Sequence, residues 1–187
     1  MATYTIFAGV NGAGKTSIYR SIYYKRDKNQ KRINTDEMVA RIGSWKDNNL
    51  QIRCAREAIR LINYYIENHI SFNQETTLSG KSIIRNIKKA RQEGFYVVMN
   101  YIGVDNCDIA KERVKIRVMK GGHGISERDI ERRYYESLNN LKKILGICNE
   151  INIYDNTNEF KYVAYICNGT VKWQRNTIPN WSRKILQ

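Results

Sequence analysis

The feature that most constrains this chain is a glycine-rich segment near its beginning. Residues 9–16 read Gly-Val-Asn-Gly-Ala-Gly-Lys-Thr, which fits the pattern G-x-x-x-x-G-K-[ST]. The segment directly follows residues 3–8, whose β-branched and aromatic side chains predict a buried strand, and a helix is expected from Lys15. A strand that enters a glycine turn and continues as a helix is the context in which this pattern binds phosphate.

Each residue type in this loop has a role in holding a phosphate group. Glycines let the backbone wrap the anion, so that successive N–H groups and the helix N-terminus point at it. Lys15 is expected to neutralise terminal phosphate charge, and the Thr16 hydroxyl is expected to ligate Mg²⁺. The predicted nucleotide-binding residues are Gly9, Asn11, Gly12, Ala13, Gly14, Lys15, Thr16 and Ser17.

Strands and helices are predicted to alternate along the rest of the chain. Strands are expected at 31–34, 71–75, 95–102, 151–155, 162–167 and 170–173, and helices at 35–42, 48–69, 79–94, 106–120, 126–145 and briefly after Pro179. This alternation favours an α/β P-loop fold with three layers around a mostly parallel sheet. The length of 187 residues fits one domain.

The net charge of the chain is its unusual bulk property. Thirty-two lysines and arginines face 18 aspartates and glutamates, which gives +14. A field of this sign attracts polyanions, but nucleic acid, nucleotide phosphates and an acidic protein all satisfy it, so charge alone selects none of them. Residues 23–32 carry five of these cations and are predicted to form a solvated loop.

Cysteine spacing and hydropathy indicate the compartment. The four cysteines lie far apart without a C-x-x-C pair, which is typical of small core residues in a reducing compartment. No apolar run approaches the roughly 20 residues that span a bilayer, and the first residues lack the basic and apolar regions of an export signal. The sequence therefore predicts a cytoplasmic protein without a membrane anchor.

Two late helices that carry many arginines point to a particular class of phosphate-loop protein. These proteins differ in whether water or another hydroxyl receives the phosphoryl group. A small chain with a cationic helical region, here about residues 106–135, suits a small-molecule kinase whose lid covers the transferring group. Such chemistry requires a carboxylate near the acceptor hydroxyl and arginines near the γ-phosphate.

Carboxylates at the ends of two strands are the candidates for deprotonating or binding the acceptor substrate. Asp36 follows a short strand, and a parallel sheet would bring it to the same edge as the phosphate loop, so it is the candidate general base. Helix capping is an equally weighted role for Asp36. Glu75 and Thr77 end another strand and can bind a polyhydroxy substrate, again with helix capping as the alternative. No Walker B aspartate, the acid that helps to bind the metal, is evident. Asn100 stands where this acid is expected, and Asp105 and Asp155 are the possible substitutes.

Four stretches of this chain, in order, resemble the zeta toxin-like P-loop kinases. They are residues 8–16, 33–37, 75–79 and the span from 112 to 134, and residues 154–157 and 178–181 are similar too. The resemblance implies transfer of the γ-phosphate of ATP or GTP to a sugar hydroxyl of UDP-N-acetylglucosamine, with Mg²⁺. It also implies a toxin whose nucleotide site an antitoxin blocks; here that partner would be a separate chain with an acidic surface.

The resemblance also assigns roles to residues. It gives Asp36 the general base position, Lys15 and Thr16 the nucleotide and metal roles, and Glu75 and Thr77 the sugar-binding roles. Arg113 matches the first lid arginine of the family. The second is Arg117 or Arg133, because a Gly-Gly-His segment at 121–123 replaces the lid sequence of the toxins.

Two departures from the family pattern leave the acceptor open. Thr35 stands where the family often has proline, and Ser79 stands where the toxins tend to carry a substrate-contacting arginine. The leading hypothesis is therefore a kinase acting on a small-molecule hydroxyl such as that of a sugar nucleotide. The alternative is an enzyme or binder directed at nucleic acid through the basic helices.

Overall fold

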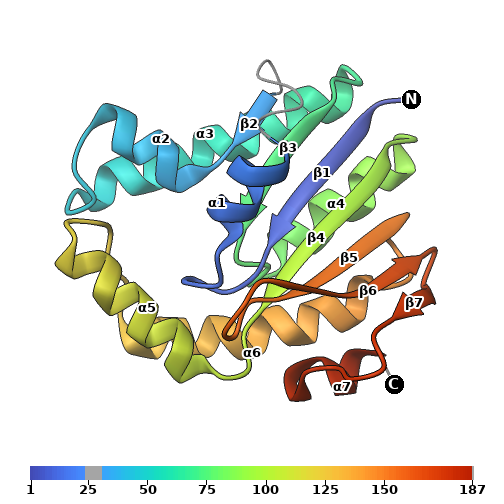
Figure 1. Ribbon diagram of the computed structural model, residues 1–187. Helices are drawn as coiled ribbons and strands as arrows, with labels where there is room; N and C mark the ends of the chain where they lie inside the picture. Colours follow the sequence, from blue (N-terminus) through green and yellow to red (C-terminus); the bar gives the residue numbers. More distant parts are fainter. Residues whose placement is uncertain (24–30, 187) are drawn as a thin grey trace.

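A mostly parallel seven-stranded sheet organises the chain. The computed structural model describes residues 1–23 and 31–186 (Figure 1). The strands are β1 (Thr3–Ala8), β2 (Lys31–Ile33), β3 (Phe72–Thr76), β4 (Tyr96–Gly103), β5 (Glu150–Asp155), β6 (Lys161–Cys167) and β7 (Thr170–Gln174). They lie in the order β2-β3-β1-β4-β5-β6-β7, with parallel pairing from β2 to β5 and antiparallel pairing of β6 and β7 at one edge.

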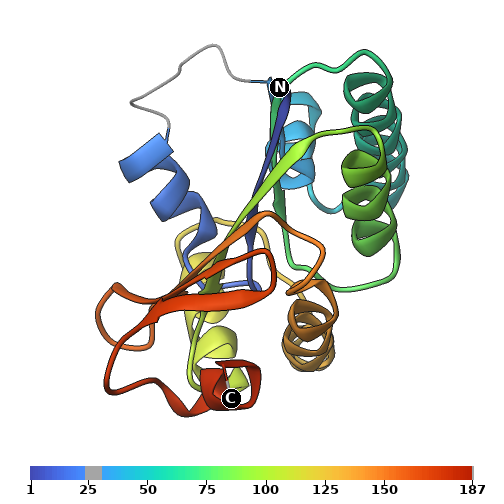
Figure 2. The same ribbon diagram turned by 90° about the vertical axis from the view of Figure 1, so that its right-hand side faces the viewer.

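Helices cover both faces of this sheet. They are α1 (Lys15–Ile18), which continues as the π-helical turn η1 (Tyr19–Tyr23), α2 (Thr35–Ile42), α3 (Asn48–Glu67), α4 (Ser82–Gln92), α5 (Cys107–Met119), α6 (Glu127–Ile144) and α7 (Asn180–Leu186). Figure 2 shows α1 on one side of the sheet and α3 with α4 on the other. The predicted α/β fold in three layers is therefore confirmed.

Strand β1 lies at the centre of the core because both of its faces are covered. Tyr4, Ile6 and Ala8 pack in the cluster formed with α3 and α4, whereas Phe7 packs in the cluster formed with α1 and α5. All four side chains are fully buried. A parallel strand buried on both faces reads as a nearly continuous apolar run, and the sequence of β1 has this character.

The strand order brings separate parts of the sequence to one edge. Strand β1 pairs with β3 on one side and β4 on the other, and β3 pairs with β2. The segments that follow β1, β2 and β3 therefore emerge side by side at the carboxyl edge of the sheet, which is where ligands bind in open parallel sheets. This placement of residues 9–16, 34–36 and 75–77 agrees with the prediction.

Two sequence-based expectations about the chain need correction. Helix α4 begins at Ser82 rather than near 79, because Leu78 and Gly80 have φ angles of 57° and 83°, which no α-helix accommodates. Within the predicted solvated loop at 23–32, residues 24–30 lie outside the described part of the chain. Arg32 is not solvated, however: it belongs to β2 and its side chain is only 10% exposed.

The remaining predicted elements agree with the structure to within a few residues. Cys54, Cys107 and Cys148 are buried, as expected of small core side chains. Among the helices of residues 1–23 and 31–186, none is long and apolar enough to cross a membrane.

Candidate active site

The glycine-rich segment forms a tight loop between β1 and α1. Gly9 and Gly14 have φ angles of +144° and +101°, and a Cβ atom at Gly9 would lie 2.2 Å from the Ile102 carbonyl oxygen. Only glycine therefore fits at Gly9 beside strand β4. The Ala13 amide donates to the Val10 carbonyl at 3.1 Å, which closes the turn. In the part of the chain that the structure describes, no side chain caps the start of α1, an arrangement that presents helix N–H groups to an anion.

Lys15 is buried beneath this loop. Its side chain donates from Nζ to the Val10 carbonyl oxygen at 3.1 Å. Burial lowers the pKa of Lys15, attraction by Glu75 and Asp36 opposes that shift, and repulsion by Arg117 and Arg133 adds to it. All four charged groups thus act on the lysine of the loop, although they come from four different segments of the chain.

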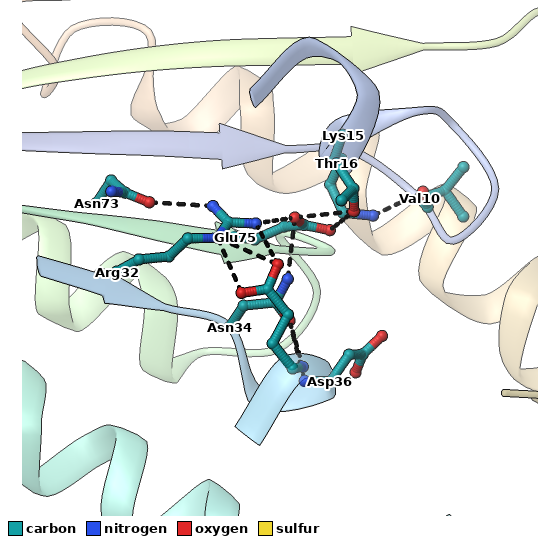
Figure 3. Close-up of polar contacts among 9 residues, drawn as sticks. Val10, Lys15, Thr16, Arg32, Asn34, Asp36, Asn73 and Glu75 are labelled. Carbon is teal, nitrogen blue, oxygen red and sulfur yellow. Dashed lines mark hydrogen bonds and ion pairs between the residues drawn. The ribbon is translucent and has the colours of Figure 1, made fainter. Parts of the chain in front are cut away.

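Glu75 is the acidic residue nearest to the loop threonine (Figure 3). The Thr16 hydroxyl donates to its two carboxylate oxygens at 3.0 and 3.1 Å. Asn34 Nδ2 donates to Oε2 at 3.0 Å, and Arg32 Nη2 donates to the same oxygen at 2.6 Å. Hydroxyl and carboxylate oxygens are the ligands that Mg²⁺ prefers, so this pair fits a metal bound beside the loop.

Asp36 lies in the first turn of α2, but it does not cap that helix. The cap is Asn34, whose Oδ1 accepts hydrogen bonds from the backbone N–H groups of Asp36 at 2.9 Å and Glu37 at 3.3 Å. The carboxylate of Asp36 is exposed and makes no hydrogen bond or ion pair within the described residues. Figure 3 shows it outside the cluster around Glu75. The alternative capping role is therefore taken by Asn34.

Three adjoining cavities meet at Asp36. One, of about 560 Å³, extends along the loop and is lined by Lys15, Thr16, Glu75, Arg113 and Arg117, among others. A second, of about 170 Å³, lies between the loop and the end of β3 and is lined by Lys15, Glu75, Thr77 and Arg133, among others. The largest, of about 780 Å³, lies between α2 and the connection from α5 to α6. Asp36 is the carboxylate that all three share.

The structure brings all three predicted lid arginines to this site. Arg113 donates to the Thr157 carbonyl at 3.0 Å and lines the loop cavity. Arg117 has two buried nitrogens, Nε and Nη2, without a partner in the described chain, and Arg133 has one, Nε. Buried N–H groups without a partner are costly, so an anion bound here would satisfy them. Arg117 and Arg133 both line these cavities, so their positions do not decide which of them is the second lid arginine.

Asp155, one of the two acids named as substitutes at the metal site, has structural partners. Asp155 accepts hydrogen bonds from Trp181 Nε1 at 2.8 Å and from the Thr157 hydroxyl at 2.7 Å. Asn100 is buried in β4 and its Oδ1 accepts a hydrogen bond from Asn152 Nδ2 at 3.3 Å. The acid that does lie against Thr16 is Glu75, which the sequence assigned to the acceptor. Only the adjacency of β1 and β3 could have indicated this contact.

Two aromatic rings join the opposite walls of the largest cavity. Trp45 lies in the connection from α2 to α3, and His123 lies in the connection from α5 to α6; their ring centroids are 4.1 Å apart. In Figure 1 these two connections face each other on the left. Burial lowers the pKa of His123, with Asp36 opposing the shift. The two stacked rings therefore form part of the lining of this cavity.

With this geometry established, comparison with known sequences identifies the family. The sequence model of the family described as Zeta toxin matches residues 3–164. The chain belongs to the zeta toxin family. A protein of Haemophilus influenzae described as uncharacterized is 40% identical over 128 residues, which cover 68% of this chain and 89% of that protein.

Solved structures share the fold of this zeta toxin family member. AvrRxo1-ORF1:-ORF2 with ATP has a TM-score of 0.76 at 15% identity, covering 100% of this chain and 64% of that chain. The PezAT chromosomal toxin–antitoxin system of Streptococcus pneumoniae has a TM-score of 0.63 at 18% identity, covering 86% and 70%. This chain thus spans less than two thirds of AvrRxo1-ORF1:-ORF2. The shared fold is an α/β P-loop fold.

Proposed function

We propose that this protein is a kinase that transfers the γ-phosphate of ATP or GTP to a hydroxyl of a sugar nucleotide such as UDP-N-acetylglucosamine. The observation that carries the proposal is the position of Asp36. Its carboxylate, which has no hydrogen-bond or ion-pair partner within residues 1–23 and 31–186, borders both the cavity along the phosphate loop and the large cavity on the other side. A base at the junction of two chambers suits transfer of a group from one bound molecule to another.

The nucleotide would occupy the loop cavity with Mg²⁺. Residues 9–17 would surround its phosphates, and Thr16 and Glu75 would hold the metal ion. Within residues 1–23 and 31–186 no three acidic, histidine or cysteine side chains cluster as a metal site. Sparse protein ligation is usual for Mg²⁺, which keeps water and phosphate oxygens as its other ligands. When bound, the ion supplies neutralisation of phosphate charge.

The phosphoryl transfer would use Asp36 as the base and cationic side chains near it to neutralise charge. Asp36 accepts the proton of the acceptor hydroxyl while that oxygen forms a bond to the γ-phosphorus. The bond from phosphorus to the bridging oxygen breaks, and its electron pair leaves with the nucleoside diphosphate. Lys15, Arg117 and Arg133 would offset the negative charge on the transferring group, because they line the cavities beside the loop.

The large cavity would hold the acceptor. Its volume of about 780 Å³ lies within the range of about 300–1,000 Å³ usual for small-molecule sites. Thr77 lines the smaller cavity next to Asp36 and remains a predicted contact for the acceptor. Glu75 lines the same cavity and was predicted for the same role, but its contact with Thr16 favours the metal ion instead. Family membership supports a sugar nucleotide as the acceptor. A protein located in the cytoplasm would have access to such a substrate.

Family membership also supports a role in a toxin–antitoxin pair. The PezAT system is one such pair of proteins. With a net charge of +14, this chain would attract a separate antitoxin with an acidic surface.

Phosphate transfer is testable with labelled nucleotide. The protein, labelled ATP or GTP and Mg²⁺ are incubated with UDP-N-acetylglucosamine, with a metabolite extract and with RNA, and products are identified by mass spectrometry. A phosphorylated sugar nucleotide is expected. Labelled RNA alone would instead support the nucleic-acid-directed alternative, and nucleotide binding without any phosphorylated product would refute the kinase.

The base assignment has its own control. Asp36→Asn should abolish transfer and retain nucleotide binding, because the amide cannot accept the proton. Asp108→Asn makes the same chemical change at an exposed side chain of α5, 82% exposed, and should leave transfer unchanged. Transfer that survives in Asp36→Asn would overturn the assignment.

A further inference from the structure

Arg32 is a partly buried arginine that contacts several residues close to the phosphate loop. Its side chain is 10% exposed and crosses from β2 over the end of β3 (Figure 3). Nη2 donates to Glu75 Oε2 at 2.6 Å, and Nη1 donates to Asn73 Oδ1 at 3.0 Å. Nε and Nη2 both donate to the carboxylate of Glu37, with distances of 3.1–3.3 Å. All three nitrogens of the guanidinium are thus engaged.

The flat face of the same group lies on an aromatic ring. Cζ of Arg32 is 3.6 Å from the ring centroid of Tyr19. Tyr19 begins η1, which continues the helix that starts at Lys15. Arg32 therefore joins the helix after the phosphate loop to the ends of two strands and to α2. A lysine has one compact charge and no planar fork, so it cannot make this set of contacts at once.

The contacts of Arg32 and Asn34 fall on one oxygen of Glu75. Oε2 accepts from Arg32 Nη2 and from Asn34 Nδ2, which hold it against the protein. The Thr16 hydroxyl lies within hydrogen-bond distance of both oxygens, at 3.0 Å from Oε1 and 3.1 Å from Oε2. Arg32 and Asn34 thus fix the carboxylate through Oε2, in a position where it faces the loop residue expected to bind the metal.

We infer that Arg32 is a positioning residue that holds the Glu75 carboxylate beside Thr16 and thereby sets the affinity of the loop for Mg²⁺ with nucleotide. This inference rests on the proposed function only in requiring a metal–nucleotide complex in the loop. Groups that orient metal-binding side chains affect metal affinity or activity by about 10–100-fold. A purely structural role for Arg32 would instead change stability and nucleotide affinity with and without metal alike.

The test measures binding rather than turnover. A fluorescent ATP analogue is titrated into wild type, Arg32→Gln and Arg32→Lys, first with EDTA and then over a series of Mg²⁺ concentrations. Arg32→Gln should raise the Mg²⁺ concentration for half-maximal enhancement of binding by about 10–100-fold and leave the affinity in EDTA unchanged. Arg32→Lys should fall between wild type and Arg32→Gln, because it keeps the charge and loses the fork.

A matched arginine serves as the control. Arg60 also makes a two-pronged contact with a glutamate, Glu57, but on the exposed surface of α3. Arg60→Gln should bind metal and nucleotide like wild type. If Arg32→Gln does not fold, Arg32→Lys decides the question by the same titration.

Two results would overturn the inference. They are wild-type Mg²⁺ dependence in the folded variants, and an equal loss of affinity with and without metal. Failure of the proposed function gives a different pattern, in which wild type binds the analogue with Mg²⁺ and phosphorylates no hydroxyl. In that case the role of Arg32 is still decided by the binding data.

Discussion

Replacing Asn34 by alanine perturbs two features at once, because this buried amide serves the start of α2 and the carboxylate of Glu75. Its Oδ1 caps the helix by accepting from the Asp36 and Glu37 amides. Its Nδ2 donates to Glu75 Oε2 at 3.0 Å. Loss of a helix cap costs about 1 kcal/mol, and loss of a hydrogen bond to a charged group costs about 1.5–3 kcal/mol. Glu75 keeps Arg32 and Thr16 as partners, which limits the second cost.

We therefore expect Asn34→Ala to lower the free energy of unfolding by about 2–4 kcal/mol. For a chain of this length that corresponds to a melting temperature lower by about 5–15 °C. Denaturant unfolding followed by circular dichroism measures the change. The exposed Asn158, changed to alanine, is the control and should alter stability by less than about 0.5 kcal/mol.

A second substitution separates the two contributions. Asn34→Asp keeps an oxygen that can cap the helix and replaces the donor to Glu75 by a like-charged acceptor. It should therefore keep α2 in place and disturb Glu75. In Asn34→Ala, by contrast, the loosened first turn should displace Asp36, so that kcat falls more than nucleotide affinity. An unfolding midpoint for Asn34→Ala equal to that of wild type would refute this reasoning.

Two further substitutions test the cavities and the loop lysine. Trp45→Ala removes the ring stacked on His123 at 4.1 Å, a contact worth about 1 kcal/mol. The KM for the acceptor should therefore rise about fivefold, while the affinity for nucleotide stays unchanged. An equal change in the acceptor KM and in nucleotide affinity would contradict a role for Trp45 in the large cavity. Lys15→Met should abolish ATP binding in a titration and leave the melting temperature equal or higher, because burial disfavours the lysine charge. The pKa of Lys15 is lowered in the folded state, so at pH values between the lowered and the ordinary pKa the unfolded chain binds more protons than the folded chain. The stability of the wild type should therefore rise with pH in this range. Lys15→Met should not show this rise. A melting temperature below that of wild type would contradict the burial argument.

The sequence predicted the parts of the site that local pattern determines. The glycine loop is recognisable because glycine, lysine and threonine stand at fixed spacing after a strand, and Asp36 because it follows a short strand of a parallel sheet. Family resemblance added the lid arginines. In each of these cases the evidence lies within a few consecutive residues.

The parts that the sequence did not predict depend on which segments become neighbours. Glu75 meets Thr16 only because β3 pairs with β1, and strand order is not visible in local periodicity. Arg32 belongs to a run of cations that resembles a solvated loop, and its burial follows from the acids that approach it from β3 and α2. Trp45 and His123 lie in two connections that are far apart in the sequence, so neither segment predicts their contact.

The concentration of positive charge around the loop has a consequence for the protein when no nucleotide is bound. Arg117 and Arg133 both repel the charge of Lys15, so a small anion bound among these side chains would lower that repulsion. Such an anion would stabilise the folded chain by mass action. Inorganic phosphate, abundant in every cell, would then compete with nucleotide for the same amides.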